Sequence, residues 1–182
     1  MAKVLIVYGS GEGQTEKVAD FIGERLRKQK HDVDVLRGKH LPKEFDIEHY
    51  GAIIVAASVR MMKYQHSIVD FARKYHARLD AVPSAFVSVS MSEASDGFQQ
   101  EWLDHFIKDT GWKPARFASF AGALMYQEYD FATRLVMKQI SKKSGLTTDT
   151  SKNHEFTDWE AVGRFAEEFA AALVEPVAGT AD

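Results

Sequence analysis

The stretch Val4-Leu5-Ile6-Val7-Tyr8-Gly9-Ser10-Gly11-Glu12-Gly13-Gln14-Thr15 decides how this chain folds. It begins with an uninterrupted apolar run, which is typical of a strand buried on both faces of a parallel sheet. It ends where a helical pattern begins. A glycine- and hydroxyl-rich turn between a buried strand and a helix presents backbone N–H groups and the positive end of the helix dipole. The stretch therefore predicts an anion site.

The composition of this turn narrows the anion to a single phosphate group. It contains no lysine, which excludes the lysine-bearing loop of the nucleotide triphosphatases. The dinucleotide fingerprint would have a third glycine where this chain has Gln14, so that motif is incomplete. The residues predicted to bind the phosphate, through N–H and O–H donors, are Ser10, Gly11, Glu12, Gly13, Gln14 and Thr15. An ordinary turn without a ligand is the alternative.

Glu12 is the unusual member of this set, because a carboxylate repels a phosphate. We expect Glu12 to contribute its backbone N–H and to turn its side chain toward solvent. The glycines on either side of it allow close approach of a ligand or a positive φ angle.

The composition of the whole chain restricts the class of protein. Its 182 residues are 45% apolar and 27% charged, with a formal net charge of −3, which suits one globular domain and gives no sign of nucleic-acid binding. The absence of cysteine excludes disulfides and thiol chemistry, and the histidines form no metal-ligand pattern. We expect one domain over residues 1–174 and a disordered tail at 175–182. Without a secretory signal or a membrane-spanning run, the expected location is cytoplasmic.

Apolar runs alternate with helical patterns along the chain. Strands are predicted at residues 3–8, 32–36, 51–57, 84–89 and 116–124, and helices at 14–30, 66–79, 98–110, 129–144 and 157–173. This alternation is typical of a doubly wound α/β domain. With the first strand central, the five parallel strands take the order 2-1-3-4-5. A ligand then binds past the carboxyl ends of the strands, at the switch point between the first and third strands.

Two further loops follow strands at this switch point. The loop after residues 51–57 offers polar, apolar and aromatic side chains that could flank a planar ring: Ser58, Val59, Arg60, Met61, Met62 and Tyr64. The loop after residues 84–89 begins with Ser90 and Met91. Tyr64 can stack on such a ring, and Arg60 can place positive charge beside a reduced, anionic one. Surface loop residues without a ligand are the alternative.

The helix predicted at residues 129–144 is basic. Arg134, Lys138, Lys142 and Lys143 occur there with no acidic residue among them. A basic amphipathic helix can lie on an anionic membrane. The segment Arg134–Lys143 is therefore a candidate for peripheral contact with the inner face of the cell membrane, and a solvated helix face is the alternative.

Several motifs along the chain resemble those of one family. In order they are Gly13-Gln14-Thr15, Ala57-Ser58-Val59-Arg60 with Tyr64 and His66-Ser67, Pro83-Ser84-Ala85-Phe86, Trp112-Lys113-Pro114, Ala121-Gly122-Ala123-Leu124-x-Tyr126, and Thr148-Asp149-Thr150 with Phe156-Thr157-Asp158-Trp159-Glu160. Together they resemble the bacterial flavodoxin-like, menaquinone-dependent protoporphyrinogen IX oxidases (dehydrogenases), over residues 3–173. The last two motifs are the specific ones, since a general flavodoxin would lack them.

The resemblance implies a flavodoxin-like fold, FMN as cofactor and a role in haem biosynthesis. The implied reaction is the six-electron oxidation of protoporphyrinogen IX to protoporphyrin IX, with the electrons passed to a quinone. The FMN phosphate would lie at Ser10 to Thr15, and the flavin ring between Ser58–Tyr64 and Ser90–Met91. The resemblance assigns no catalytic side chain, although His66 or Tyr64 could assist proton transfer.

One segment departs from the family pattern, and two other functions stay open. The segment after the fourth strand is longer and rich in Lys and Arg in the family, whereas here residues Met91–Phe98 are short and acidic. A flavodoxin-like electron carrier or quinone reductase would lack porphyrinogen activity and be reduced rapidly by a reductase or NAD(P)H. A non-catalytic module would have lost the cofactor, which the intact phosphate loop disfavours.

Overall fold

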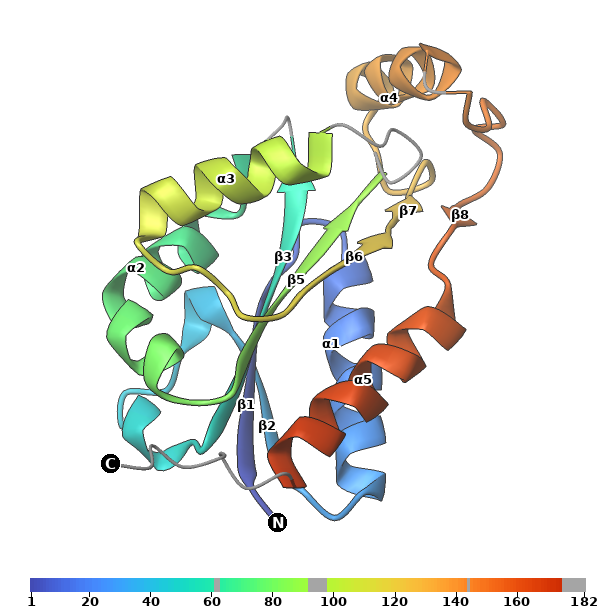
Figure 1. The fold of residues 1–182 in the computed structure, drawn as a ribbon. Coiled ribbons are helices and arrows are strands. Elements are labelled where there is room, and N and C mark those ends of the chain that lie inside the picture. Colours follow the sequence, from blue (N-terminus) through green and yellow to red (C-terminus); the bar gives the residue numbers. More distant parts are fainter. Residues whose placement is uncertain (61–62, 92–97, 144, 175–182) are drawn as a thin grey trace, which may run out of the picture.

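A computed structural model describes residues 1–60, 63–91, 98–143 and 145–174 of the chain (Figure 1). Its central strands are β1 (Lys3–Gly9), β2 (Asp32–Arg37), β3 (Ala52–Arg60), β5 (Ser84–Ser90) and β6 (Phe117–Ala121). Within the described residues these strands are parallel and run in the order β2-β1-β3-β5-β6. The predicted flavodoxin-like order is thus confirmed. A two-residue strand, β4 (Lys63–Tyr64), pairs antiparallel with the end of β3.

Alternation along β1 explains why its apolar run is continuous. Val4 and Ile6 belong to the core on one face of the sheet, and Leu5 and Val7 to the core on the other face. All four side chains are fully buried. A strand buried on both faces favours apolar side chains at every position, which is why the pattern was visible in the sequence.

Helices cover both faces of the sheet. Helices α1 (Gln14–Lys28) and α5 (Trp159–Val174) pack on one face, and α2 (His66–Ala81) and α3 (Phe98–Thr110) on the other (Figure 1). Two short 3₁₀ helices, η1 (Gly38–His40) and η2 (Ile47–His49), connect β2 to β3. Because β2 and β3 lie on opposite sides of β1, the chain connections diverge at its carboxyl end and leave room there for a ligand.

An arm made of residues 123–156 projects beyond the carboxyl ends of the strands (Figure 1). Its base is β7 (Ala123–Leu124) paired antiparallel with β8 (His154–Glu155), and it contains α4 (Phe131–Lys143). The prediction of one strand over residues 116–124 is wrong at its end. Gly122 donates its N–H to the carbonyl of Ser90 and accepts a hydrogen bond from the N–H of Phe156, so the chain leaves the sheet there.

Some predictions concern residues that the structure does not describe. These are the tail at 175–182, the side chains of Met61 and Met62, and residues 92–97 of the segment after β5. The domain limits and the tail therefore stay predictions. Among the described residues, no helix is both long and apolar enough to cross a membrane.

Candidate functional site

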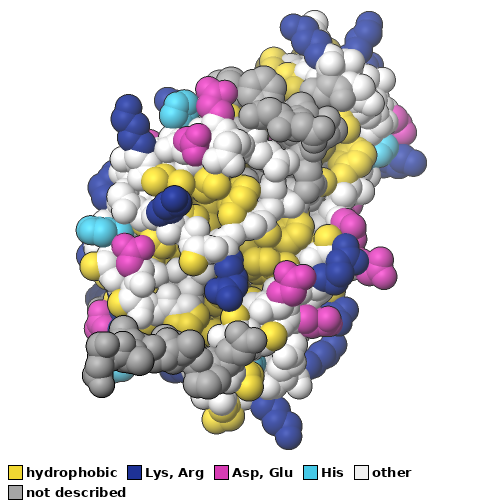
Figure 2. Space-filling view, viewed as in Figure 1, with side chains coloured by type: hydrophobic (Ala, Val, Ile, Leu, Met, Phe, Trp, Pro, Cys, Tyr) yellow, Lys and Arg dark blue, Asp and Glu magenta, His cyan; other side chains and the backbone are white. Residues whose placement is uncertain are grey.

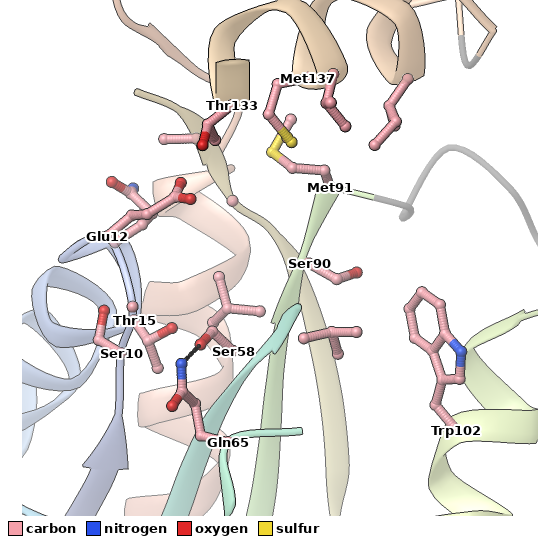
Figure 3. A pocket seen from close by; sticks show the side chains of 18 of the residues that line it. Ser10, Glu12, Thr15, Ser58, Gln65, Ser90, Met91, Trp102, Thr133 and Met137 are labelled. Carbon is pink, nitrogen blue, oxygen red and sulfur yellow. Dashed lines mark hydrogen bonds between the residues drawn. The ribbon is translucent and has the colours of Figure 1, made fainter. Parts of the chain in front are cut away.

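A cavity of about 550 Å³ lies at the carboxyl ends of β1, β3 and β5, where the switch point was predicted (Figure 3). Its volume is in the range of small-molecule sites. Its walls come from the phosphate loop, the strand ends, α3 and the arm. The lining residues are Ser10, Gly11, Glu12, Gln14, Thr15, Ser58, Val59, Gln65, Val89, Ser90, Met91, Trp102, Gly122, Ala123, Ala132, Thr133, Val136, Met137 and Ile140.

The backbone of the predicted phosphate loop has the shape that its glycines suggest. The N–H of Gly13 donates to Ser10 Oγ over 2.8 Å, which closes the turn. Gly13 has a φ of 88°, in the left-handed region, and is the N-cap of α1. A Cβ on Gly11 would come within 3.2 Å of Gln65 Nε2. Gly13 is therefore needed for its positive φ angle, and Gly11 lies close to the amide of Gln65.

Buried polar atoms in this cavity lack partners. Gln14 Oε1, Thr15 Oγ1 and Ser90 Oγ make no hydrogen bond with the described residues, although these side chains are only 5%, 1% and 4% exposed. An unpaired buried polar group costs about 1–3 kcal/mol. Such atoms are expected where a ligand completes the hydrogen bonding, so the residues present fit a phosphate-bearing cofactor with further polar groups.

Glu12 does not turn to solvent, so that prediction is wrong. Its carboxylate accepts a hydrogen bond of 2.7 Å from the hydroxyl of Tyr129, which belongs to the arm. Burial raises the pKa of Tyr129, and the hydrogen bond and charge of Glu12 raise it further. Tyr129 therefore stays a neutral donor near neutral pH. The phosphate loop is joined to the arm by this contact, which the local sequence could not reveal.

Tyr64 packs against the core and is not among the residues that line the cavity. Because β4 folds back on β3, Tyr64 pairs with Val59 in the ladder. Its ring meets those of Phe86 and Phe106 edge-on, at centroid distances of 5.1 and 5.4 Å. Its hydroxyl donates to Ser88 Oγ, and burial raises its pKa. The structure thus places Tyr64 in packing, whereas the sequence predicted it at a ring.

Other residues predicted beside a ring do line the cavity. Ser58 and Val59 lie at the end of β3, and Ser90 and Met91 at the end of β5. Ser58 Oγ accepts a hydrogen bond of 3.2 Å from Gln65 Nε2 (Figure 3). The contacts of these residues with a flavin stay a prediction, and the side chains of Arg60, Met61 and Met62 lie outside the described part of the chain.

Sequence reasoning missed two walls of the cavity. Trp102 of α3 lines one side and is 6% exposed (Figure 3). Helical spacing predicts that Trp102 points inward but not that its end of the helix lies over the cavity. Residues of α4 form the other wall, with Met137 near Met91. The sequence signal for this wall was the apolar side chains of residues 131–143, a segment interpreted mainly by its positive charge.

Few groups in the site can ionise. Among the lining residues that the structure describes, Glu12 is the one with an ionisable side chain of acidic or basic type. His66, a candidate for proton transfer, does not line the cavity. Its Nδ1 lies 2.6 Å from Asp70 Oδ2 on an exposed part of α2. No cluster of His, Asp or Glu side chains suited to a metal ion occurs in the described parts of the chain.

Known proteins match this chain over most of its length. The flavodoxin-domain family matches residues 5–151. Protoporphyrinogen IX dehydrogenase (quinone) of Escherichia coli strain K12 is 34% identical over 178 residues, which are 96% of this chain and 98% of that protein. This chain belongs to the flavodoxin-type protoporphyrinogen IX dehydrogenase family. A family member from Leishmania major is 31% identical over 93% of this chain and 75% of its own length.

Solved structures of flavodoxins have the same fold as this chain. Oxidised flavodoxin 1 from Bacillus cereus superposes with a TM-score of 0.53 at 16% identity, over 93% of this chain and 97% of that one. The flavodoxin domain and this fold support a flavin as the cofactor of the family member described here.

Proposed function

We propose that this protein is an FMN-dependent dehydrogenase of haem biosynthesis that oxidises protoporphyrinogen IX to protoporphyrin IX and reduces a quinone. The observation that carries the proposal is the cavity, which joins a phosphate loop without Lys or Arg to an apolar wall from α4. Relatives that match nearly the whole chain have this activity in their names. The reaction balances when one porphyrinogen and three quinones give one porphyrin and three quinols.

The phosphate loop favours FMN over a dinucleotide. Its N–H groups, the hydroxyl of Thr15 and the start of α1 suit one phosphate group. Gln14, which replaces the third glycine of the dinucleotide fingerprint, is 5% exposed, and its Nε2 donates a hydrogen bond to Thr157 Oγ1. The proposed ring contacts, at the ends of β3 and β5, are Ser58, Val59, Arg60, Met61, Met62, Ser90 and Met91.

The side chains of the cavity bind and orient rather than exchange electrons. When bound, FMN supplies the redox chemistry by accepting electrons from an organic donor and passing them to a quinone. Gln65 is held by Ser58 at the edge of the phosphate loop. Trp102 and Met91 form apolar walls that exclude water from one side of the cavity. Tyr129 holds the Glu12 carboxylate on the arm side of the loop.

Helix α4 is the proposed contact with the membrane that contains the quinone. Lys138 and Lys142 are exposed, as is Phe131 at 77%, and residues 131–143 include no acid. Figure 2 shows Lys and Arg side chains at the α4 end of the molecule. Cations and an apolar ring on one exposed helix suit an anionic lipid surface. We place the protein in the cytoplasm, peripherally on the inner face of the cell membrane.

Two matched charge reversals test this contact. Lys142→Glu and Lys28→Glu each alter an exposed lysine in the last turn of a helix, α4 and α1 respectively. Reversing Lys142 should lower partition onto phosphatidylglycerol vesicles by about thirty-fold, since the reversal changes the charge by two units and each charge near an anionic membrane contributes about 1 kcal/mol. Lys28→Glu should change it far less. Equal partition of both variants onto these vesicles would contradict the contact.

The function itself is tested anaerobically. The protein is loaded with FMN, mixed with protoporphyrinogen IX, and then given menadione. Bleaching of the flavin followed by porphyrin fluorescence is the expected result. Bound FMN that stays oxidised would instead favour a flavodoxin-like electron carrier or quinone reductase, and absence of FMN binding would overturn the assignment of the phosphate loop.

A further inference from the structure

Helix α4 presents two apolar rows with different surroundings. Ala132, Val136 and Ile140 follow one another at four-residue spacing, so they share one face of the helix, and all three line the cavity. Phe131 and Leu135 form the second row, and neither lines the cavity. Val136 is 58% exposed and Leu135 is 51% exposed. The two rows therefore have similar solvent exposure, but only the first row faces the cavity.

Ala132, Val136 and Ile140, called the cavity row below, face other apolar residues across the cavity. Trp102 closes the cavity on the side of α3, and Val59, Val89 and Met91 close it at the strand ends. In Figure 3, Met137 of α4 points toward Met91, while Trp102 stands on the far side of the cavity. An exposed apolar row that faces apolar walls across a cavity marks a place for an apolar ligand.

This part of the cavity is distinct from the part that suits the phosphate. Thr15 lies in the first turn of α1, whereas Ala132, Val136 and Ile140 belong to the arm. Figure 3 shows the phosphate-loop side chains Ser10 and Thr15 on one side of the strand ends and the α4 side chains, with Met137, above them. A cofactor held by its phosphate would thus leave the α4 wall for a second molecule.

A positive charge near the cavity row suits a ligand that carries carboxylates. Lys143 follows Ile140 by three positions, which puts it on the same side of α4, and it is exposed. Residues 131–143 contain no acid to oppose it. A tetrapyrrole has broad apolar faces and carries its charge on propionate groups at one edge. Apolar faces and an anionic edge match a wall of aliphatic side chains that ends in a lysine.

We propose that Val136 and Ile140 of α4 hold the macrocycle of the tetrapyrrole substrate, and that Lys143 pairs with one of its propionates. This inference rests on the proposed function and adds the element that selects the substrate. Trp102 forms the facing wall. The arm, rather than the segment after β5, then recognises the porphyrinogen, which accounts for a segment Met91–Phe98 that is short and acidic.

Binding of protoporphyrin IX to the FMN-loaded full chain tests the proposal without turnover. Binding is followed by quenching of tryptophan fluorescence. Val136→Asp and Ile140→Asp should each raise the Kd for the porphyrin by about ten-fold or more, because a carboxylate at an apolar contact must lose its hydration. The matched control is Leu135→Asp, which should leave this Kd within about two-fold of wild type. FMN affinity, measured by flavin fluorescence, should be the same in all variants.

Lys143 is tested with two probes that differ only in charge. Lys143→Ala should weaken binding of protoporphyrin IX by about two- to five-fold, as expected for an exposed ion pair. It should not affect binding of the uncharged dimethyl ester, measured in the same detergent. An equal loss for acid and ester would remove the propionate contact from the proposal.

The outcomes separate this inference from the proposed function. If the FMN-loaded wild type neither binds protoporphyrin IX nor oxidises porphyrinogen, the function fails. If it turns over porphyrinogen while Val136→Asp and Ile140→Asp keep the wild-type Kd and KM, only the placement on α4 is overturned. Equal losses in Val136→Asp and Leu135→Asp overturn it too. Should the aspartates prevent folding, Val136→Ser, Ile140→Ser and Leu135→Ser give the same comparison.

Discussion

At Thr15 we expect stability and cofactor binding to oppose each other. Its hydroxyl is buried and has no partner among the described residues. Thr15→Val keeps the shape and removes the hydroxyl. We expect the FMN-free protein to melt at a higher temperature, because an unpaired buried group costs about 1–3 kcal/mol, and the Kd for FMN to rise about ten-fold.

Thermal melting of the FMN-free protein and a flavin-fluorescence titration measure the two effects. Thr15→Ser is the control, since it keeps the hydroxyl and should keep the affinity. A Thr15→Val protein that binds FMN as tightly as wild type would show that this hydroxyl does not contact the phosphate.

Glu12 and Tyr129 form a hydrogen-bonded pair at the predicted phosphate loop. Tyr129→Phe removes the donor to the Glu12 carboxylate and leaves a negative charge free beside the phosphate site. We expect FMN affinity to fall about five-fold at low salt and less at high salt, because salt screens exposed charges. In a Glu12→Gln background the same change should have little effect. A double-mutant cycle of FMN affinities measures the coupling, and purely additive effects would contradict it.

Residues that lie close together in the sequence were the ones whose placement could be predicted. Ser10 and Thr15 lie within one turn, and both line the cavity; their contact with a phosphate stays a prediction. Tyr64 does not line the cavity, because the fold-back of β4 onto β3 turns its ring toward Phe86 and Phe106. Tyr129 was not identified because its partner, Glu12, is distant in the sequence.

At the scale of elements, the turn from β1 to α1 depends on a positive φ angle. Gly13 has a φ of 88°, and a Cβ there would meet no atom within 4 Å. Gly13→Ala should therefore lower the free energy of unfolding by about 1 kcal/mol through backbone strain alone. Urea unfolding of the FMN-free protein measures this change.

Gly51→Ala is the matched control for this turn. A Cβ on Gly51 would meet only the carbonyl of Lys3, at 3.9 Å, which is an ordinary contact. We expect it to leave the unfolding midpoint nearly unchanged. A Gly13→Ala protein as stable as Gly51→Ala would indicate that the turn relaxes to another conformation.

The strands of the sheet were predictable and the arm was not, for one physical reason. A parallel strand buried on both faces is visible in the sequence as a short, mainly apolar run, as in β1, β3 and β5. The arm depends on Ala123 pairing with Glu155 across a long loop, and no local pattern records that pairing. The run at residues 116–124 was therefore interpreted as one strand, although the chain turns out of the sheet at Gly122.

At the scale of the whole molecule, several tyrosines tie stability to alkaline pH. Burial and the neighbouring Glu16 raise the pKa of Tyr8 to about 12. Burial also raises the pKa values of Tyr50, Tyr64 and Tyr129. The folded protein keeps these phenolic protons at a pH where the unfolded chain, with pKa values near 10, releases them. The stabilising effect is complete below about pH 10 and is lost as the pH rises further.

We therefore expect the free energy of unfolding to be flat in alkaline solution up to about pH 10 and to fall beyond it. Urea unfolding across this range, together with tyrosinate absorbance, measures both parts of the prediction. Tyr129→Phe should make the decline less steep. A stability that begins to fall near neutral pH would point to other titrating groups.

The two ends of the arm are paired with each other, which bears on how the arm was acquired. The N–H of Phe156 donates to the carbonyl of Gly122 over 3.0 Å, and β7 pairs with β8 next to it, so the two ends of the arm lie side by side. A segment with adjacent ends can be gained or lost in one genetic step, because the host needs only a short linker to close the gap. Insertion of the arm alone would thus add the α4 wall of the cavity to a flavodoxin-like domain without changing the sheet or the turn from β1 to α1.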